Sequence, residues 1–90
     1  MYYVYIVECS DGTLYVGCTN NLEKRISQHN LSKNGAHYTK LRRPVVLKYS
    51  EVFTIKGTAL KREAEIKSWR RDKKLVLVLS KTGSIYKARK

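Results

Sequence analysis

The sequence lacks the features that would place it across a membrane or in an oxidising compartment. No apolar run approaches the roughly 20 residues of a membrane-spanning helix. No charged segment followed by an apolar stretch and a small-residue cleavage site marks a secretory signal peptide. The two cysteines, Cys9 and Cys18, form no CxxC or Cys/His spacing, which argues against zinc and favours two reduced, buried thiols. We therefore expect a cytoplasmic protein.

Acidic residues are scarce as well. Seven Asp and Glu face nineteen Lys and Arg, which gives the chain a net charge of +12 at pH 7. This excess indicates a polyanionic partner, nucleic acid before an anionic membrane surface, since no helix with a strongly apolar face is predicted. A protein that is merely basic and well solvated would have the same composition. Charge alone therefore does not assign the function.

The chain has room for one domain. Its 90 residues are 42% hydrophobic, which is typical of a folded protein with a modest core and no second specificity module. We place the domain at residues 1–79 and a basic tail at residues 80–90. The apolar run at residues 75–79 fits either a strand or the end of a helix.

The start of the chain predicts a β-hairpin, with strands over residues 2–8 and 13–19 joined by a Ser-Asp-Gly turn. A two-residue loop would place Tyr5 and Tyr15 on opposite faces, whereas a three-residue loop with a left-handed glycine pairs Tyr5 with Gly17. The longer loop gives one coherent apolar face, so we expect it. That face collects Val4, Ile6, Leu14, Val16 and Cys18. The two tyrosines then share the other face, as they also would on an ordinary aromatic sheet surface packed under a helix.

A first helix is predicted over residues 21–30, with Asn20 as its N-cap. Arg25 and His29 are four residues apart, so they are neighbours on one helix face. Taken alone, the pair is equally compatible with a solvated arginine and a partly buried histidine.

A basic segment over residues 31–43 is predicted as a loop or a short broken helix, and Pro44 leads from it into a third strand over residues 45–53. Its candidate nucleic-acid contacts are Lys33, Tyr38, Lys40, Arg42 and Arg43. Cations suit phosphate oxygens, and the tyrosine could stack on a base. A solvated loop would have the same composition.

A second helix is predicted from Thr58, as its N-cap, to about residue 73. Its apolar stripe contains Ala59, Leu60, Ala64, Ile66 and Trp69. Glu63 falls near the centre of that stripe, while Glu65 points to solvent. A carboxylate on the core-facing side must be paired, protonated or bound to a metal, and Arg70 and Arg25 are the candidate ion-pair partners.

Two tripeptides on the predicted hairpin, Tyr3-Val4-Tyr5 and Tyr15-Val16-Gly17, precede Arg25, His29 and Glu63. This series resembles the GIY-YIG nuclease domain from residue 2 to about residue 75, and most of all the short stand-alone bacterial proteins of that type. Tyr3 replaces the glycine of the family name, and the two valines replace isoleucine. Cys18 stands where some members have a lysine.

The resemblance implies an α+β fold in which helices flank a three-stranded antiparallel sheet, in the order β-β-α-β-α. It also implies roles. Tyr15 would be the general base or would position the attacking water, and Tyr5 would support it by hydrogen bonding. Arg25 would hold the scissile phosphate, Glu63 would hold one Mg²⁺ or Mn²⁺ ion, and His29 would assist proton transfer or contact the phosphate.

The expected function is a metal-dependent endonuclease that hydrolyses phosphodiester bonds, in DNA rather than RNA. It would be structure-selective with little sequence specificity, as in DNA repair, and would act as a monomer, with a protein partner as one source of specificity. Phosphodiester cleavage builds negative charge on phosphoryl oxygens, which a metal ion and an arginine stabilise. The alternative is a catalytically weak module of the same fold that binds DNA or RNA. A pure binder has no need of the Tyr5, Tyr15, Arg25 and Glu63 set.

Overall fold

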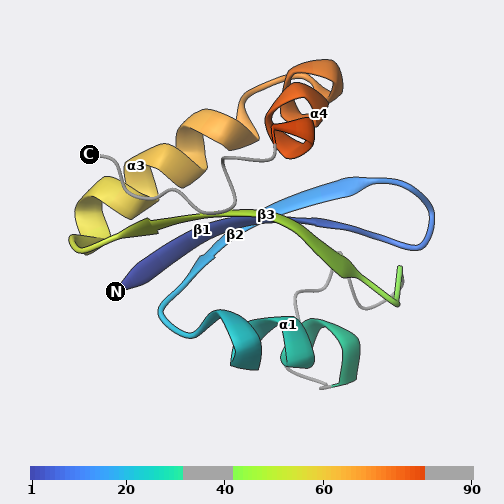
Figure 1. Cartoon of the computed structure of the whole chain (residues 1–90), viewed down its shortest axis with the longest axis horizontal. Coiled ribbons are helices and arrows are strands. Elements are labelled where there is room, and N and C mark those ends of the chain that lie inside the picture. The colour runs from blue at the N-terminus through green and yellow to red at the C-terminus, as the bar shows by residue number, and fades with distance from the viewer. Residues whose placement is uncertain (32–41, 81–90) are drawn as a thin grey trace.

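The computed structural model describes residues 1–31 and 42–80. A three-stranded antiparallel sheet in the order β2-β1-β3 has helix α1 on one face and helices α3 and α4 on the other (Figure 1). The elements are β1 (Tyr2–Glu8), β2 (Leu14–Thr19), α1 (Leu22–Leu31), β3 (Val46–Phe53), α3 (Lys56–Lys67) and α4 (Arg71–Leu79). The predicted α+β class and strand arrangement are confirmed. None of the helices in the described ranges is long and apolar enough to cross a membrane.

The β1–β2 hairpin has the predicted three-residue turn. Tyr5 lies opposite Gly17, and Gly12 has a φ of +85°, the left-handed conformation that the longer loop requires. The Asp11 carboxylate accepts hydrogen bonds from the backbone N–H and the hydroxyl of Thr13, at 3.1 and 2.7 Å, and so fixes the turn. This turn sets the register on which the site depends.

The sheet separates two apolar clusters. The cluster under α3 contains Val4, Ile6, Val16, Tyr49, Ala59 and Ile66. The cluster under α1 contains Tyr5, Val7, Cys9 and Val45, with Tyr15, Leu22 and Ile26 packed against it. The predicted division of the hairpin into two faces is therefore confirmed. Cys9 and Cys18 belong to opposite faces and are both free thiols.

A register shift in β3 lets this one strand serve both clusters. Tyr49 pairs with Ile6, but the next residue of β1, Val7, pairs with Leu47, so Lys48 is the extra residue of a bulge. Without the bulge, strict alternation would place Leu47 and Tyr49 on the same face. With it, Tyr49 joins the cluster under α3 and Leu47 faces α1.

The N-cap of α1 differs from the predicted one by one residue. The side-chain oxygen of Asn21, not that of Asn20, accepts a hydrogen bond from the N–H of Lys24 at 3.1 Å. Both asparagines are suitable N-cap residues. The path of the chain after β2 places Asn21 at the cap, where its N–H also donates to the Thr19 hydroxyl.

The second helix starts earlier than predicted. It follows Ile55, which is extended and makes no side-chain cap, so Thr58 lies inside the first turn rather than at the N-cap. The predicted stripe was also too broad: Leu60 and Ala64 are exposed. α3 rests on the sheet along a narrow line through Ala59 and Ile66.

The predicted single helix to residue 73 is wrong, because the chain breaks after Lys67. The Ser68 hydroxyl donates to the Glu65 carbonyl at 2.6 Å, and the Trp69 N–H donates to Ile66, so the last turn tightens and stops. The ambiguous run at residues 75–79 is helical and forms most of α4. Two of its side chains, Leu77 and Val78, pack against the cluster under α3.

Candidate active site

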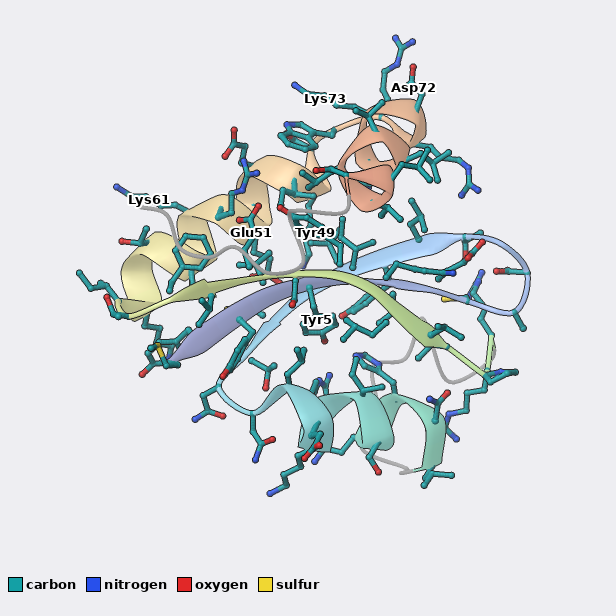
Figure 2. The ribbon with its side chains drawn as sticks, in the orientation of Figure 1. Tyr5, Tyr49, Glu51, Lys61, Asp72 and Lys73 are labelled. Atoms are coloured by element: carbon teal, nitrogen blue, oxygen red, sulfur yellow. The ribbon has the colours of Figure 1, made fainter. Side chains whose placement is uncertain are left out.

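Tyr5 lies across the backbone of its neighbour on β2. It comes from the central strand, is 1% exposed, and points to the α1 side of the sheet (Figure 2). A Cβ atom added at Gly17 would lie 2.3 Å from the Tyr5 hydroxyl oxygen and 2.5 Å from Cζ. The glycine of the second tripeptide is therefore required by the phenol ring that covers it.

His29 joins the two tyrosines. It lies near the end of α1, is 0% exposed, and its Nε2 is 2.8 Å from the Tyr5 hydroxyl oxygen. The imidazole ring meets the rings of Tyr5 and Tyr15 edge-on, with centroids 5.7 and 5.4 Å apart. The sequence pattern placed both tyrosines on one face, and the structure adds the histidine between them.

Burial fixes the protonation states of this pair. Removal from solvent raises the pKa of Tyr5 to about 12, against the opposing effect of a hydrogen bond and the positive charge of Arg25. Burial, followed by the charges of Arg25 and Arg43, lowers the pKa of His29 to about 4. At neutral pH Tyr5 is therefore a phenol and His29 a neutral imidazole. The phenol can donate its proton to Nε2 while its oxygen accepts the hydrogen bond from Arg25.

Arg25 is anchored where the two tyrosines meet α1. It is half-buried, its Nη1 donates to Gln28 Oε1 at 3.0 Å, and it also hydrogen-bonds to Tyr5. A guanidinium has five N–H donors. Its planar fork of donors matches two acceptor oxygens, such as those of a phosphate.

Glu63 approaches from α3, on the other side of the sheet. Its side chain is 18% exposed and pairs with Lys67 at 3.2 Å, rather than with Arg70 or Arg25. Burial raises the pKa values of Tyr5 and Cys18, and the charge of Glu63 adds a smaller contribution to both. The predicted direction of the side chain is thus observed.

The residue before Glu63 fixes the rotation of α3. Arg62 donates to both carboxylate oxygens of Glu51 on β3, at 2.9 and 2.9 Å, and to Glu65 at 3.0 Å. The Tyr49 hydroxyl donates to the same Glu51 carboxylate. Glu65, 56% exposed, is held on the outside of the helix, so the two neighbouring acidic residues have separate surroundings.

The donor set around Glu63 suits a metal ion that keeps most of its water ligands. The described part of the chain contains no group of three or more His, Cys, Asp or Glu side chains that could cage a cation. Mg²⁺ is commonly held by one or two carboxylates and keeps several water ligands. One half-buried carboxylate whose present partner is an exposed lysine fits that mode of binding, because such an ion pair contributes only about 0–1 kcal/mol.

The predicted nucleic-acid contacts are only partly visible. Lys33, Tyr38 and Lys40 lie outside the described residues. Arg42 donates to the Asp11 carboxylate at 3.1 Å, and so joins the hairpin turn to the start of β3. Arg43 donates to the carbonyl of His29 and, at 3.2 Å, to that of Gln28. Both arginines therefore have structural partners, and their contact with phosphate stays a prediction.

The sequence reasoning did not find Asn30. Its side chain accepts a hydrogen bond from the Val45 N–H at 2.7 Å and donates to the Val45 carbonyl at 3.1 Å. With Arg43 it ties the end of α1 to the segment before β3, and thereby holds His29 against Tyr5. The one signal in the sequence was that Asn30 directly follows the candidate histidine. No hydrophobic periodicity marks this position.

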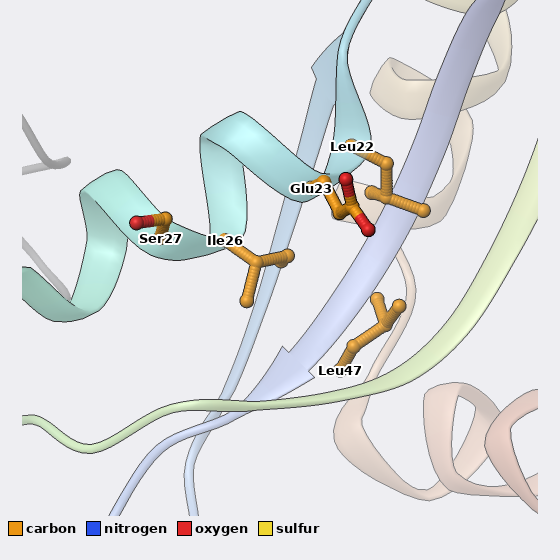
Figure 3. A pocket seen from close by; sticks show the side chains of 5 residues that line it. All are labelled: Leu22, Glu23, Ile26, Ser27 and Leu47. Carbon is orange, nitrogen blue, oxygen red and sulfur yellow. The ribbon is translucent and has the colours of Figure 1, made fainter.

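A hollow between α1 and β3 is a separate feature. Its volume is about 420 Å³, and it is lined by Leu22, Glu23, Ile26, Ser27 and Leu47 (Figure 3). Figure 3 shows the apolar side chains of Leu22, Ile26 and Leu47 pointing toward one another across it. None of the described residues that line it is a cation, so these residues offer no charge to a phosphate.

The fold and this arrangement of side chains are those of a known class of protein. Residues 1–75 match the family described as the GIY-YIG catalytic domain, and the chain belongs to that family, which is a nuclease family. The chain is 56% identical over 77 residues to a UPF0213 protein of Staphylococcus saprophyticus, covering 86% of this chain and 93% of the relative. A UPF0213 protein of Syntrophus aciditrophicus is 55% identical over 76 residues, covering 84% of this chain and 87% of the relative.

A solved structure is similar as well. The solution NMR structure of a UPF0213 protein from Bacillus halodurans has a TM-score of 0.58 and 43% identity, covering 92% of this chain and 87% of that one. The resemblance to short stand-alone GIY-YIG proteins, predicted from the two tripeptides together with Arg25, His29 and Glu63, is confirmed.

Proposed function

We propose that this protein is a metal-dependent endonuclease that hydrolyses phosphodiester bonds in DNA. The observation that carries the proposal is the difference between the two tyrosines. Tyr5 is fully buried and kept protonated, whereas Tyr15, packed on the same imidazole, is half-buried and keeps a route to solvent. Tyr15 is therefore the hydroxyl that can meet an attacking water.

The remaining groups have complementary roles. Arg25 would hold the scissile phosphate, since its guanidinium can form a fork with two phosphate oxygens. Glu63 would hold one Mg²⁺ or Mn²⁺ ion, which when bound supplies charge stabilisation for the phosphoryl oxygens. Tyr5 and His29 would act as positioning residues, because neither is exposed and their mutual hydrogen bond fixes the ring against which Tyr15 packs.

Structure selectivity would follow from the kind of contact, because phosphate contacts carry no sequence information. The shape of the nucleic acid, or a protein partner, would supply the choice of site. The alternative, a binding module with weak catalysis, predicts that the tyrosines and Glu63 can be replaced without effect on turnover.

The test is cleavage of a panel of duplex, single-stranded, flapped and branched DNA substrates with Mg²⁺, with Mn²⁺ and with chelator. Tyr15→Phe keeps the ring and removes the oxygen, so it should cut at least about a hundredfold more slowly, the usual loss for a general base. Glu63→Gln should abolish cleavage but keep binding, while the matched Glu65→Gln should cut like the parent. If Tyr15→Phe stays within about threefold of the parent, Tyr15 has no part in the chemistry.

A further inference from the structure

A dense group of cations lies where α3 gives way to α4. Within residues 67–74 there are five cations and a single carboxylate, Asp72. We call this group the α3–α4 corner, and its cations are Lys67, Arg70, Arg71, Lys73 and Lys74. All except the half-buried Lys74 are exposed. The local charge of +4 is a third of the net charge of the whole chain, +12.

Few of these cations are paired with a carboxylate of the described residues. Lys67 pairs with Glu63, and Arg70 lies 4.0 Å from Asp72 in a highly exposed pair. Among residues 1–31 and 42–80, Arg71, Lys73 and Lys74 have no carboxylate within ion-pairing distance. Like charges held this close repel one another, and an external polyanion would remove that cost.

The corner is built on a fixed frame. The Trp69 ring packs against the cluster under α3, with Lys73 Nζ 4.4 Å and the Arg62 guanidinium carbon 5.2 Å from its centroid. Arg62 is itself held by Glu51. The cations therefore project from a docked helix junction, which lowers the entropy lost on binding.

The corner and the tyrosines lie on opposite sides of the sheet. In Figure 2, Lys73 and Asp72 lie above the strands and Tyr5 below them. A phosphate at the tyrosines and a phosphate at the corner would therefore lie on opposite faces of the sheet. Nucleic acid that meets both must extend around the edge of the sheet or carry a second arm.

We propose that the α3–α4 corner is a second phosphate-binding surface, which holds an arm of a branched or extended nucleic acid away from the scissile phosphate. This rests on the proposed function only for the choice of nucleic acid as the polyanion. An anionic membrane is the other polyanion that a basic helix end can meet, since Val76 and Leu79 of α4 are exposed. A helix of nine residues with its cations gathered at one end fits phosphates better than a lipid surface.

The test is binding to labelled DNA in chelator, which needs no cleavage. Arg71→Gln/Lys74→Gln is compared with Lys48→Gln/Lys61→Gln, which removes the same two charges elsewhere. Probes are a four-way junction and a short duplex of about 8 base pairs. If each corner cation meets one phosphate, the log–log salt slope on the junction should flatten by roughly 1.8, at about −0.9 per contact. The affinity lost between about 50 and 200 mM salt should then shrink by about tenfold.

The short duplex has no second arm, so the corner variant should lose less of its salt slope on this probe than on the junction. The control variant should lose the same amount of slope on both probes. Equal slopes for the corner and control variants on the junction would overturn the proposal. The proposal would also be overturned if the corner variant lost binding to phosphatidylserine vesicles but bound DNA like the parent, because the corner would then bind a membrane. A protein that binds as expected but never cleaves would leave the corner standing and remove only the proposed nuclease activity.

Discussion

Replacement of Gly17 by alanine tests the central contact of the site directly. The added methyl group would lie 2.3 Å from the Tyr5 hydroxyl oxygen, 2.5 Å from Cζ and 3.0 Å from Cε2. Normal contact needs more than about 3.4 Å, so the phenol must move by about 1 Å or the strands must separate. Tyr5 has little freedom to move, because it is buried and bonded to His29.

The cost has two parts. Overpacking of a well-packed core destabilises by about 1–3 kcal/mol. Displacement of the phenol also weakens the hydrogen bond to His29, which contributes about 1 kcal/mol. A gain of about 0.4–1 kcal/mol from the lower entropy of the unfolded chain opposes them. We expect Gly17→Ala to lower the free energy of unfolding by about 1–3 kcal/mol and Tm by roughly 4–8 °C for each kcal/mol.

The chain supplies two matched controls. A methyl group at Gly57 meets nothing within 4 Å and lies in a helix, so Gly57→Ala should stabilise by up to about 1 kcal/mol. A methyl group at Gly12 also meets nothing, but its φ of +85° is unfavourable for alanine, so Gly12→Ala should cost about 1 kcal/mol. The three variants separate steric clash from backbone strain and from the general effect of alanine.

Urea unfolding of the three variants, followed by circular dichroism, is the assay. The double variant Gly17→Ala/Tyr5→Phe refines it, since loss of the hydroxyl leaves the 2.5 Å contact with Cζ and should restore little stability. The reasoning would be refuted if the free energy of unfolding of Gly17→Ala were within about 0.5 kcal/mol of the parent value. A change that small is usual for substitutions at the surface and is incompatible with a fixed ring above the glycine.

Two further predictions concern the support of the site. The pKa of His29 is about 4 in the folded protein and near 6.5 in the unfolded chain. Between pH 6.5 and pH 4 the unfolded chain therefore binds more protons than the folded protein. The free energy of unfolding should fall by up to about 1.4 kcal/mol per pH unit as the pH drops through this range. Urea unfolding from pH 4.5 to 7.5 should show this slope, reduced in His29→Gln; the same slope in both proteins would contradict it. Arg43→Gln removes donors from two α1 carbonyls and should cost about 1 kcal/mol or more, whereas Arg42→Gln, which breaks a partly exposed ion pair with Asp11, should cost about 0–1 kcal/mol. Equal losses in thermal unfolding would show that Arg43 does not support the helix.

The hairpin was predictable because its rules are local. Alternation with period 2, one coherent apolar face and a turn that contains a glycine fixed the register and hence the partner of Tyr5. The family resemblance then added the residues that follow the hairpin. Arg25 and His29 were expected to be neighbours from their spacing on one helix. The resemblance also implied the fold class, a three-stranded antiparallel sheet flanked by helices.

The parts that could not be predicted depend on tertiary contacts. The break after Lys67 follows from the docking of Trp69 and the bond from Ser68 to the preceding turn, neither of which alters the helical periodicity before it. The run at residues 75–79 has β-branched and leucine residues that suit a strand, but it is helical, with one side packed on the core. The complete burial of His29 depends on Asn30 and Arg43, whose partners lie many positions along the chain.

The position of Gly17 determines where the Tyr5 hydroxyl lies in the sheet. Tyr5 starts on the central strand but extends over Gly17, so its hydroxyl lies above the edge strand β2 on the α1 side. Burial is the main reason that the pKa of Tyr5 is raised, and the charge of Glu63, on the α3 side of the sheet, adds a small contribution. A side chain at position 17 would push the phenol away from this edge and would move the hydroxyl that His29 and Arg25 hold. The glycine therefore lets the Tyr5 ring extend from the central strand over the edge strand. In the proposed function, Arg25 on α1 would hold a phosphate near this hydroxyl, and Glu63 on α3 would hold the metal ion.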